Sequence, residues 1–208
     1  MAKAHVMFFV AVVTGLMLAQ PVSAGRLTST VTDPAGDALL WFPPGPAPEY
    51  QDIVGATITL RDGRFILVME MAGSIPASPA LPPGTKLLEW SWEFVTDPAT
   101  FHTGFPWGQA ATSPVDYVAQ ILWDGASFMG QLIDRTPLVT GGEAVVTRLA
   151  FSIIGAAFRT SVEAAMVGNP SSFDWITTSR TWVAELGTFA WFPVDGAPNC
   201  CVAGSWPS

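Results

Sequence analysis

Apolar and polar residues alternate along several stretches of this chain, and a period of two is typical of β-strands that bury one face. The clearest stretch is 87–95, where four large apolar side chains share one face and polar side chains share the other. The apolar set is Leu88, Trp90, Trp92 and Phe94, and the polar set is Glu89, Ser91 and Glu93. We expect the apolar face to pack into the core and the polar face to lie in solvent.

Two pairs of alternating stretches flank an Asp-Gly dipeptide, which favours a tight reversal between antiparallel strands. The first pair is 53–60 and 64–72 around Asp62-Gly63, and the second is 117–123 and 127–133 around Asp124-Gly125. Further strands are predicted at 143–154, 173–178 and 186–192. Tryptophans that fall on predicted strands are expected in the core, and these are Trp90, Trp92, Trp123 and Trp175.

One short helix is predicted at 161–167, because Thr160 and Glu163 stand at capping-box spacing and Gly168 can end the helix. Successive hairpins without strand-helix alternation favour an all-β fold, an antiparallel two-sheet β-sandwich of about eight or nine strands. A β-barrel is the alternative architecture.

The N-terminal segment has the pattern of an export signal: a cationic start at Lys3, an apolar run over 6–19, and small residues before Ala24. The apolar run is shorter than the roughly 20 residues that a membrane-spanning helix needs. We therefore predict a signal peptide over 1–24, cleaved after Ala24, and a single β-sandwich domain over 25–208. The mature chain is expected to be secreted or extracytoplasmic, with no membrane span.

The charge balance narrows the range of partners. The 208 residues include 9 Lys+Arg and 17 Asp+Glu, which gives a net charge of −8. A chain without a basic cluster lacks the electrostatic footprint of a polyanion-binding protein, so nucleic acid is not an expected partner. The 19 Gly and 18 Pro suit many turns between strands.

The two cysteines, Cys200 and Cys201, are adjacent. A disulfide between these two cysteines therefore cannot link distant parts of the fold. Three states stay open: a strained vicinal disulfide, a disulfide to another molecule through Cys200 or Cys201, or free thiols. A zinc site is not favoured, because the spacing of zinc ligands is missing.

Short acidic turns occur near both ends of the predicted domain, at Asp33 and Asp37, at Asp52, and at Asp195. Calcium binds six to eight oxygens, typically carboxylates and loop carbonyls, so converging acidic loops would form a structural calcium site. The alternative is that each aspartate stabilises its own turn.

Aromatic residues also lie in Pro/Gly-rich stretches, where flat rings can stack on a pyranose. These residues are Trp41, Phe101, Phe105 and Trp107. The alternative is that the rings fold back as lids over the open ends of the sandwich.

Several short motifs together resemble a known family. They are the segment 33–37 (Asp-Pro-Ala-Gly-Asp), Asp52-Ile53 at the start of a strand, a hairpin ending in Ala72-Gly73, a Trp-rich strand, and a late Asp-Gly-Ala-Pro at 195–198. This order is similar to that of secreted β-sandwiches related to family nine carbohydrate-binding modules and DOMON domains. The resemblance implies binding of sugars, haem or calcium. Haem in DOMON domains uses axial Met and His ligands, but His102 lies in a loop, so we expect no haem.

Catalytic patterns are not found. Glu89 and Glu93 would stand roughly 13 Å apart along one strand, further than the carboxyls of a glycosidase. His102 is the only histidine of the predicted mature chain, and there is neither a Gly-x-Ser-x-Gly motif nor a phosphate-binding loop. We therefore predict an exported, non-enzymatic binding module for a glycan or cell-envelope carbohydrate. The alternative is a structural or adhesive surface protein that engages another protein.

Overall fold

The computed structural model describes residues 27–41, 44–98, 102–103, 112–113, 115–185, 188–198 and 203–207. The fold is mostly β, with 60% of these described residues in strands and 8% in helical turns, and all strand pairs among them are antiparallel. No helix in the described ranges reaches seven residues. The prediction of an all-β antiparallel sandwich is confirmed.

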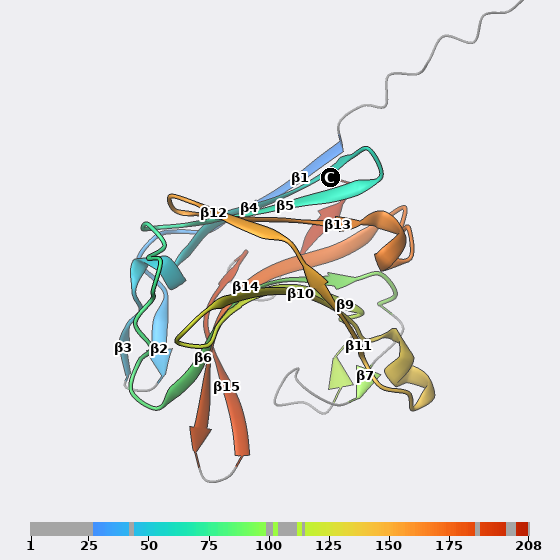
Figure 1. The fold of residues 1–208 in the computed structure, drawn as a ribbon. Coiled ribbons are helices and arrows are strands. Elements are labelled where there is room, and N and C mark those ends of the chain that lie inside the picture. The colour runs from blue at the N-terminus through green and yellow to red at the C-terminus, as the bar shows by residue number, and fades with distance from the viewer. Residues whose placement is uncertain are drawn as a thin grey trace, which may run out of the picture.

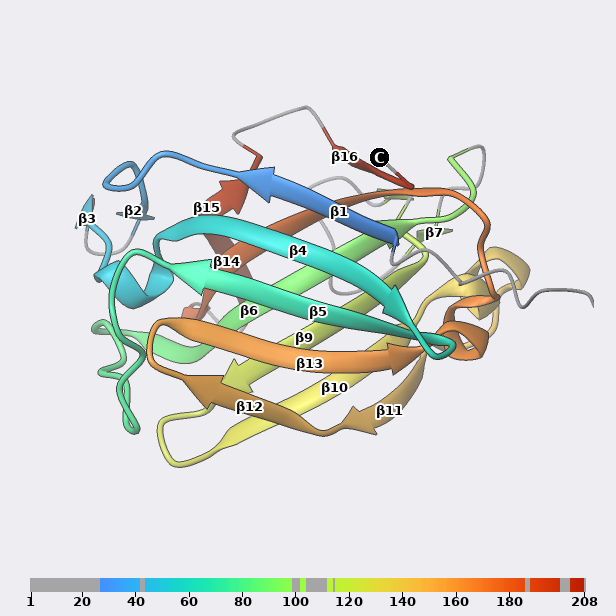
Figure 2. The same cartoon turned by 90° about the horizontal axis from the view of Figure 1, so that it is seen from above.

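The strands form two stacked layers, which Figure 1 shows edge-on and Figure 2 shows from above. The five-stranded sheet has the order β1 (Leu27–Thr32), β4 (Ile53–Arg61), β5 (Arg64–Met71), β13 (Ala157–Glu163) and β12 (Phe151–Ile154). The seven-stranded sheet has the order β11 (Val145–Leu149), β10 (Phe128–Asp134), β9 (Tyr117–Trp123), β6 (Thr85–Val95), β14 (Phe173–Glu185) and β15 (Thr188–Ala197), with β16 (Gly204–Trp206) also paired to β14. The two sheets therefore hold more strands than the sequence predicts.

Short elements complete the fold. Two small hairpins consist of β2 (Leu39–Trp41) with β3 (Pro44–Pro46), and of β7 (His102–Thr103) with β8 (Thr112–Ser113). Three 3-10 turns are η1 (Glu49–Gln51), η2 (Thr136–Thr140) and η3 (Ala164–Val167). None of the described helical segments is long and apolar enough to cross a bilayer.

Both predicted Asp-Gly hairpins are confirmed. Asp62 and Gly63 both have positive φ, 50° and 73°, between β4 and β5. Gly125 has φ 91° between β9 and β10. Positive φ at these positions gives the turn the twist of the flanking strands, and aspartate and glycine adopt it at low cost.

The core lies between the two sheets and is rich in aromatic rings. The four tryptophans predicted to be in the core are buried, and Phe65 contacts both Phe173 and Trp206 edge-on. The alternation of β6 is therefore confirmed on its apolar face. Burial of each large apolar side chain contributes about 1.5–3 kcal/mol to stability.

The stretch 143–154 is not one strand, contrary to the prediction. Its first part, β11, pairs with β10, and its second part, β12, pairs with β13 of the other sheet. The carbonyl of Ala150, between them, accepts a hydrogen bond from Thr160 Oγ1 at 2.8 Å. The segment thus passes from one layer to the other, which simple alternation does not reveal.

The predicted helix at 161–167 is also wrong over its first half. Ser161 and Val162 continue β13 and pair with β5, because Val162 buries its side chain in the core. Only the 3-10 turn η3 follows, and it ends at Gly168 with φ 78°. Backbone pairing with β5 has overridden the local capping signal.

The expectation that the polar face of β6 lies in solvent is wrong. Glu89, Ser91 and Glu93 are all buried. Arg180 of the neighbouring strand β14 stands directly opposite Glu89 in the sheet and supplies the positive charge that buried carboxylates need.

Candidate functional site

Three strands bring the predicted acidic residues together. Asp33 follows β1 and its backbone N–H donates to the carbonyl of Val54 on β4. Asp52 immediately precedes β4, and Asp195 lies on β15, which contacts β4. The acidic turns thus meet at one corner of the sandwich because β1 and β15 both adjoin the start of β4.

Asp33, Asp37 and Asp195 form a tight acidic group, in which one carboxylate oxygen of each lies within 4.8 Å of the others. Asp52 lies beside this group, because its Oδ2 accepts a hydrogen bond from the backbone N–H of Gly36 at 2.7 Å. The structure therefore brings together the four aspartates that the sequence predicts as a calcium or turn-stabilising set.

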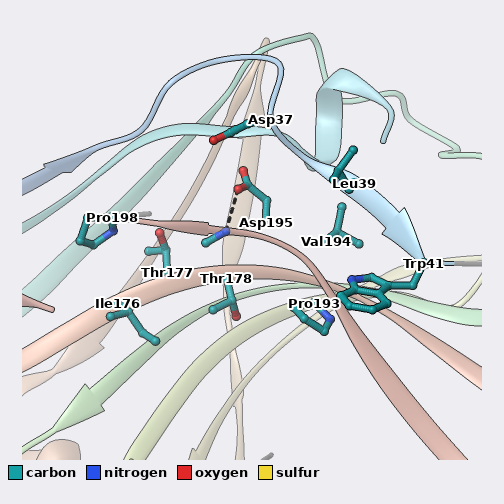
Figure 3. A pocket seen from close by; sticks show the side chains of 11 residues that line it. Asp37, Leu39, Trp41, Ile176, Thr177, Thr178, Pro193, Val194, Asp195 and Pro198 are labelled. Carbon is teal, nitrogen blue, oxygen red and sulfur yellow. Dashed lines mark hydrogen bonds between the residues drawn. The ribbon is translucent and has the colours of Figure 1, made fainter. Parts of the chain in front are cut away.

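The backbone holds Asp195 firmly in place. Its Oδ2 accepts a hydrogen bond from the N–H of Ile53 at 2.5 Å, and its Oδ1 accepts one from Gly196 at 2.8 Å, the dashed line in Figure 3. The pKa of Asp195 is raised to about 6, chiefly because the carboxyl is buried and also because of the charges of Asp37 and Asp52, although the two backbone hydrogen bonds act to lower it. This corner of the protein thus concentrates negative charge.

The spacing of the acidic group suits a calcium ion. Calcium–oxygen bonds are about 2.3–2.6 Å long, so two oxygens on one ion stand up to about 5 Å apart. The 4.8 Å limit within the acidic group lies inside that range. Carboxylates from Asp33, Asp37 and Asp195 are also the hard oxygen ligands that calcium prefers.

A groove of about 430 Å³ begins at the acidic group. Its lining residues are Asp37, Leu39, Trp41, Ile176, Thr177, Thr178, Pro193, Val194, Asp195, Gly196 and Pro198. In Figure 3, Asp37 and Asp195 face each other at one end, and Trp41 lies beside Pro193 at the other. The groove therefore combines carboxylates, an aromatic ring and aliphatic side chains.

Trp41 is the prominent aromatic residue of this groove. It is 57% exposed, and its ring stacks on Phe192 with centroids 6.5 Å apart and planes inclined by 27°. It lies at the end of β2, which contacts β15. The exposure of Trp41 leaves part of its ring surface available to a ligand, as the sequence prediction requires.

The other predicted site residues are not all placed. Phe101, Phe105 and Trp107 lie outside the described residues, as do Cys200 and Cys201.

Sequence reasoning missed the wall of the groove formed by β14 and β15. The register of β14 against β15 shifts between Ser179 and Arg180, and no local pattern in the sequence signals such a shift.

A second polar cluster lies on the opposite face of β6 from the core. The Arg180 guanidinium donates to Glu89 Oε1 at 2.8 Å, to Ser91 Oγ at 3.1 Å and to Glu93 Oε1. Trp182 Nε1 donates to Glu89 Oε2 at 2.7 Å. The two carboxylates therefore converge on one guanidinium, although their residues are four positions apart on an extended strand.

Opposite charges keep two buried arginines, Arg180 on β14 and Arg135 just before η2, ionised in the interior. Burial alone would lower the pKa of Arg180, but the charges of Glu93 and Glu89 and their hydrogen bonds raise it above its ordinary value. Burial lowers the pKa of Arg135 to about 10, against the charges of Glu93 and Asp116, which raise it. Both side chains remain cationic at neutral pH.

No protein-family model matches this chain, and no curated protein or solved structure shows detectable similarity to it. The resemblance to family nine carbohydrate-binding modules and DOMON domains therefore stays a prediction.

Proposed function

We propose that this chain is an exported, non-catalytic module that binds a glycan in the groove between Trp41 and the acidic group. The observation that carries the proposal is the position of Trp41, a half-exposed indole on the wall of a groove that also holds two carboxylates. A sugar ring presents an apolar face and a rim of hydroxyls, which suits a flat ring beside hydrogen-bond acceptors.

The groove residues support recognition of hydroxyl groups. Asp37 and Asp195 supply carboxylate oxygens at one end of the groove. Charged acceptors form stronger hydrogen bonds to hydroxyls than neutral ones. Leu39 and Val194 add apolar surface, so the groove fits an amphipathic ligand better than a purely ionic one.

The buried glutamates support a binding role rather than hydrolysis. A glycosidase places its two carboxyls in different environments, so that one is protonated and the other ionised. Glu89 and Glu93 instead share the same guanidinium, that of Arg180, and are both buried. This arrangement suits a structural network.

The test is calorimetric titration of the secreted protein with soluble cello-, xylo- and manno-oligosaccharides. Trp41→Ala is expected to weaken binding about tenfold or more, because the stacking surface is lost. The fold should persist, because most of the Trp41 surface is exposed.

Ile154→Ala is the matched control, since Ile154 is 58% exposed on β12 and lies outside the groove lining. Its affinity should equal that of the unaltered protein. Unchanged affinity in Trp41→Ala, or no heat with any of these oligosaccharides, would contradict the proposal. Reductant-sensitive dimers on a gel, without glycan binding, would favour the adhesive alternative.

A further inference from the structure

The acidic group and the groove share two residues. Asp37 and Asp195 belong to the trio whose carboxylate oxygens lie within 4.8 Å of one another, and both also line the groove. Figure 3 shows their carboxylates facing each other at the end of the groove away from Trp41. A cation held there would be in contact with whatever occupies the groove.

A further carboxylate at this corner points to a cation as its partner. Asp52 is only 4% exposed, and its Oδ2 is bound by the N–H of Gly36, next to Asp37. Its Oδ1 is buried and receives no hydrogen bond from any described residue. A buried carboxylate oxygen without a donor is costly, and a nearby cation would offset that cost.

The groove itself supplies no positive charge. Among its described lining residues there is no lysine, arginine or histidine, while two are aspartates. An anionic glycan would therefore meet uncompensated repulsion, and a neutral glycan would not. The site thus favours a divalent cation together with a neutral sugar.

We propose that Asp33, Asp37 and Asp195 bind a calcium ion at the end of the groove, and that this ion is ligated directly by two vicinal hydroxyls of a neutral glycan. This inference rests on the proposed glycan-binding function. Calcium takes six to eight oxygens, so three aspartates leave several positions for water or for sugar hydroxyls. Asp37 is exposed, which leaves the groove side of the ion open.

The first experiment measures glycan binding with and without calcium. Chelation is expected to weaken binding of manno- or xylo-oligosaccharides about tenfold or more, and Asp37→Asn should weaken it similarly in calcium, because a ligand to the ion is lost. Asp62→Asn is the matched control, since Asp62 is an exposed aspartate in the β4–β5 turn. Equal affinities with calcium and with chelator would overturn the proposal.

The second experiment replaces calcium by terbium and counts its water ligands from luminescence lifetimes in H₂O and D₂O. Adding the oligosaccharide should remove about two water ligands, because two hydroxyls take their positions. An O-methylated oligosaccharide without free vicinal hydroxyls should remove none. A constant number of water ligands while the oligosaccharide binds would show that the ion is only structural, and this would overturn direct ligation.

The two experiments also separate failure of this inference from failure of the proposed function. Terbium bound by the unaltered protein but not by Asp37→Asn, without binding of any oligosaccharide, would keep the cation site and overturn glycan binding together with ligation. Oligosaccharide binding without terbium binding would keep the glycan function and overturn the cation site.

Discussion

Replacing Arg180 by methionine tests whether the polar network on β6 stabilises the fold. The side chains of Arg180, Glu89 and Glu93 are 6%, 0% and 5% exposed, so the ion pairs are shielded from water. Methionine keeps much of the side-chain volume but removes the charge and the hydrogen bonds that Arg180 donates to Glu89, Ser91 and Glu93. Glu89 and Glu93 would then remain buried but lose the cation with which both form ion pairs.

Removing one partner of a buried ion pair costs about 3–5 kcal/mol, because the remaining charge is uncompensated. For a domain of this size, each kcal/mol lowers Tm by roughly 2–4 °C, so Arg180→Met should lower Tm by roughly 6–20 °C. Urea unfolding followed by tryptophan fluorescence measures the free energy directly.

Two control proteins make this result specific. Arg64→Met removes a half-exposed ion pair with Glu163 and should cost about 1 kcal/mol or less. Combining Arg180→Met with Glu89→Gln and Glu93→Gln should recover much of the lost stability, because the two carboxylates that lost their ion-pair partner are then neutral amides. If Arg180→Met changed the free energy of unfolding no more than Arg64→Met does, the network would not be the stabilising element inferred here.

Two further predictions concern the backbone and the acidic corner. Gly130→Ala should lower the free energy of unfolding, measured in urea, by about 1–3 kcal/mol, because the Cβ of the new alanine would lie 2.7 Å from the carbonyl oxygen of Leu149. Gly45→Ala is the control and should cost less than half as much, because a Cβ at position 45 would meet open space. Asp195 has a folded-state pKa of about 6, above its unfolded value, so its carboxyl should contribute more to stability as pH falls from about 7 towards 4. In chelator, the free energy of unfolding of the unaltered protein should therefore rise relative to that of Asp195→Asn over this pH range. A constant difference in free energy of unfolding between the unaltered protein and Asp195→Asn over that pH range would contradict the role of this carboxyl.

Local patterns predicted those parts of the fold that depend on neighbours in the chain. Alternation predicted β6 and both Asp-Gly hairpins, because side chains on successive positions of a strand point to opposite faces. It also predicted the buried tryptophans, Trp90 and Trp175 among them. The same reasoning failed at 161–167, where pairing of Val162 with β5 decided the conformation.

The candidate site was only partly predictable, because its residues come from distant parts of the chain. Asp33, Asp37, Asp52 and Asp195 could be identified as candidates, since acidic turns are visible in the sequence. Their convergence depends on β1 and β15 both lying beside the start of β4, which no local pattern encodes. The groove wall on β14 and β15 depends in the same way on a register shift at Ser179.

The amino-acid sequence by itself determined the strand character, the turns and the residue types available for chemistry, because those properties follow from short-range periodicity and backbone preference. Only the tertiary structure decided that Glu89 and Glu93 are buried against Arg180 and that two aspartates share a groove with Trp41. Contacts of this kind depend on which strands become neighbours, and the order of the strands depends on how the two sheets of the sandwich pack together.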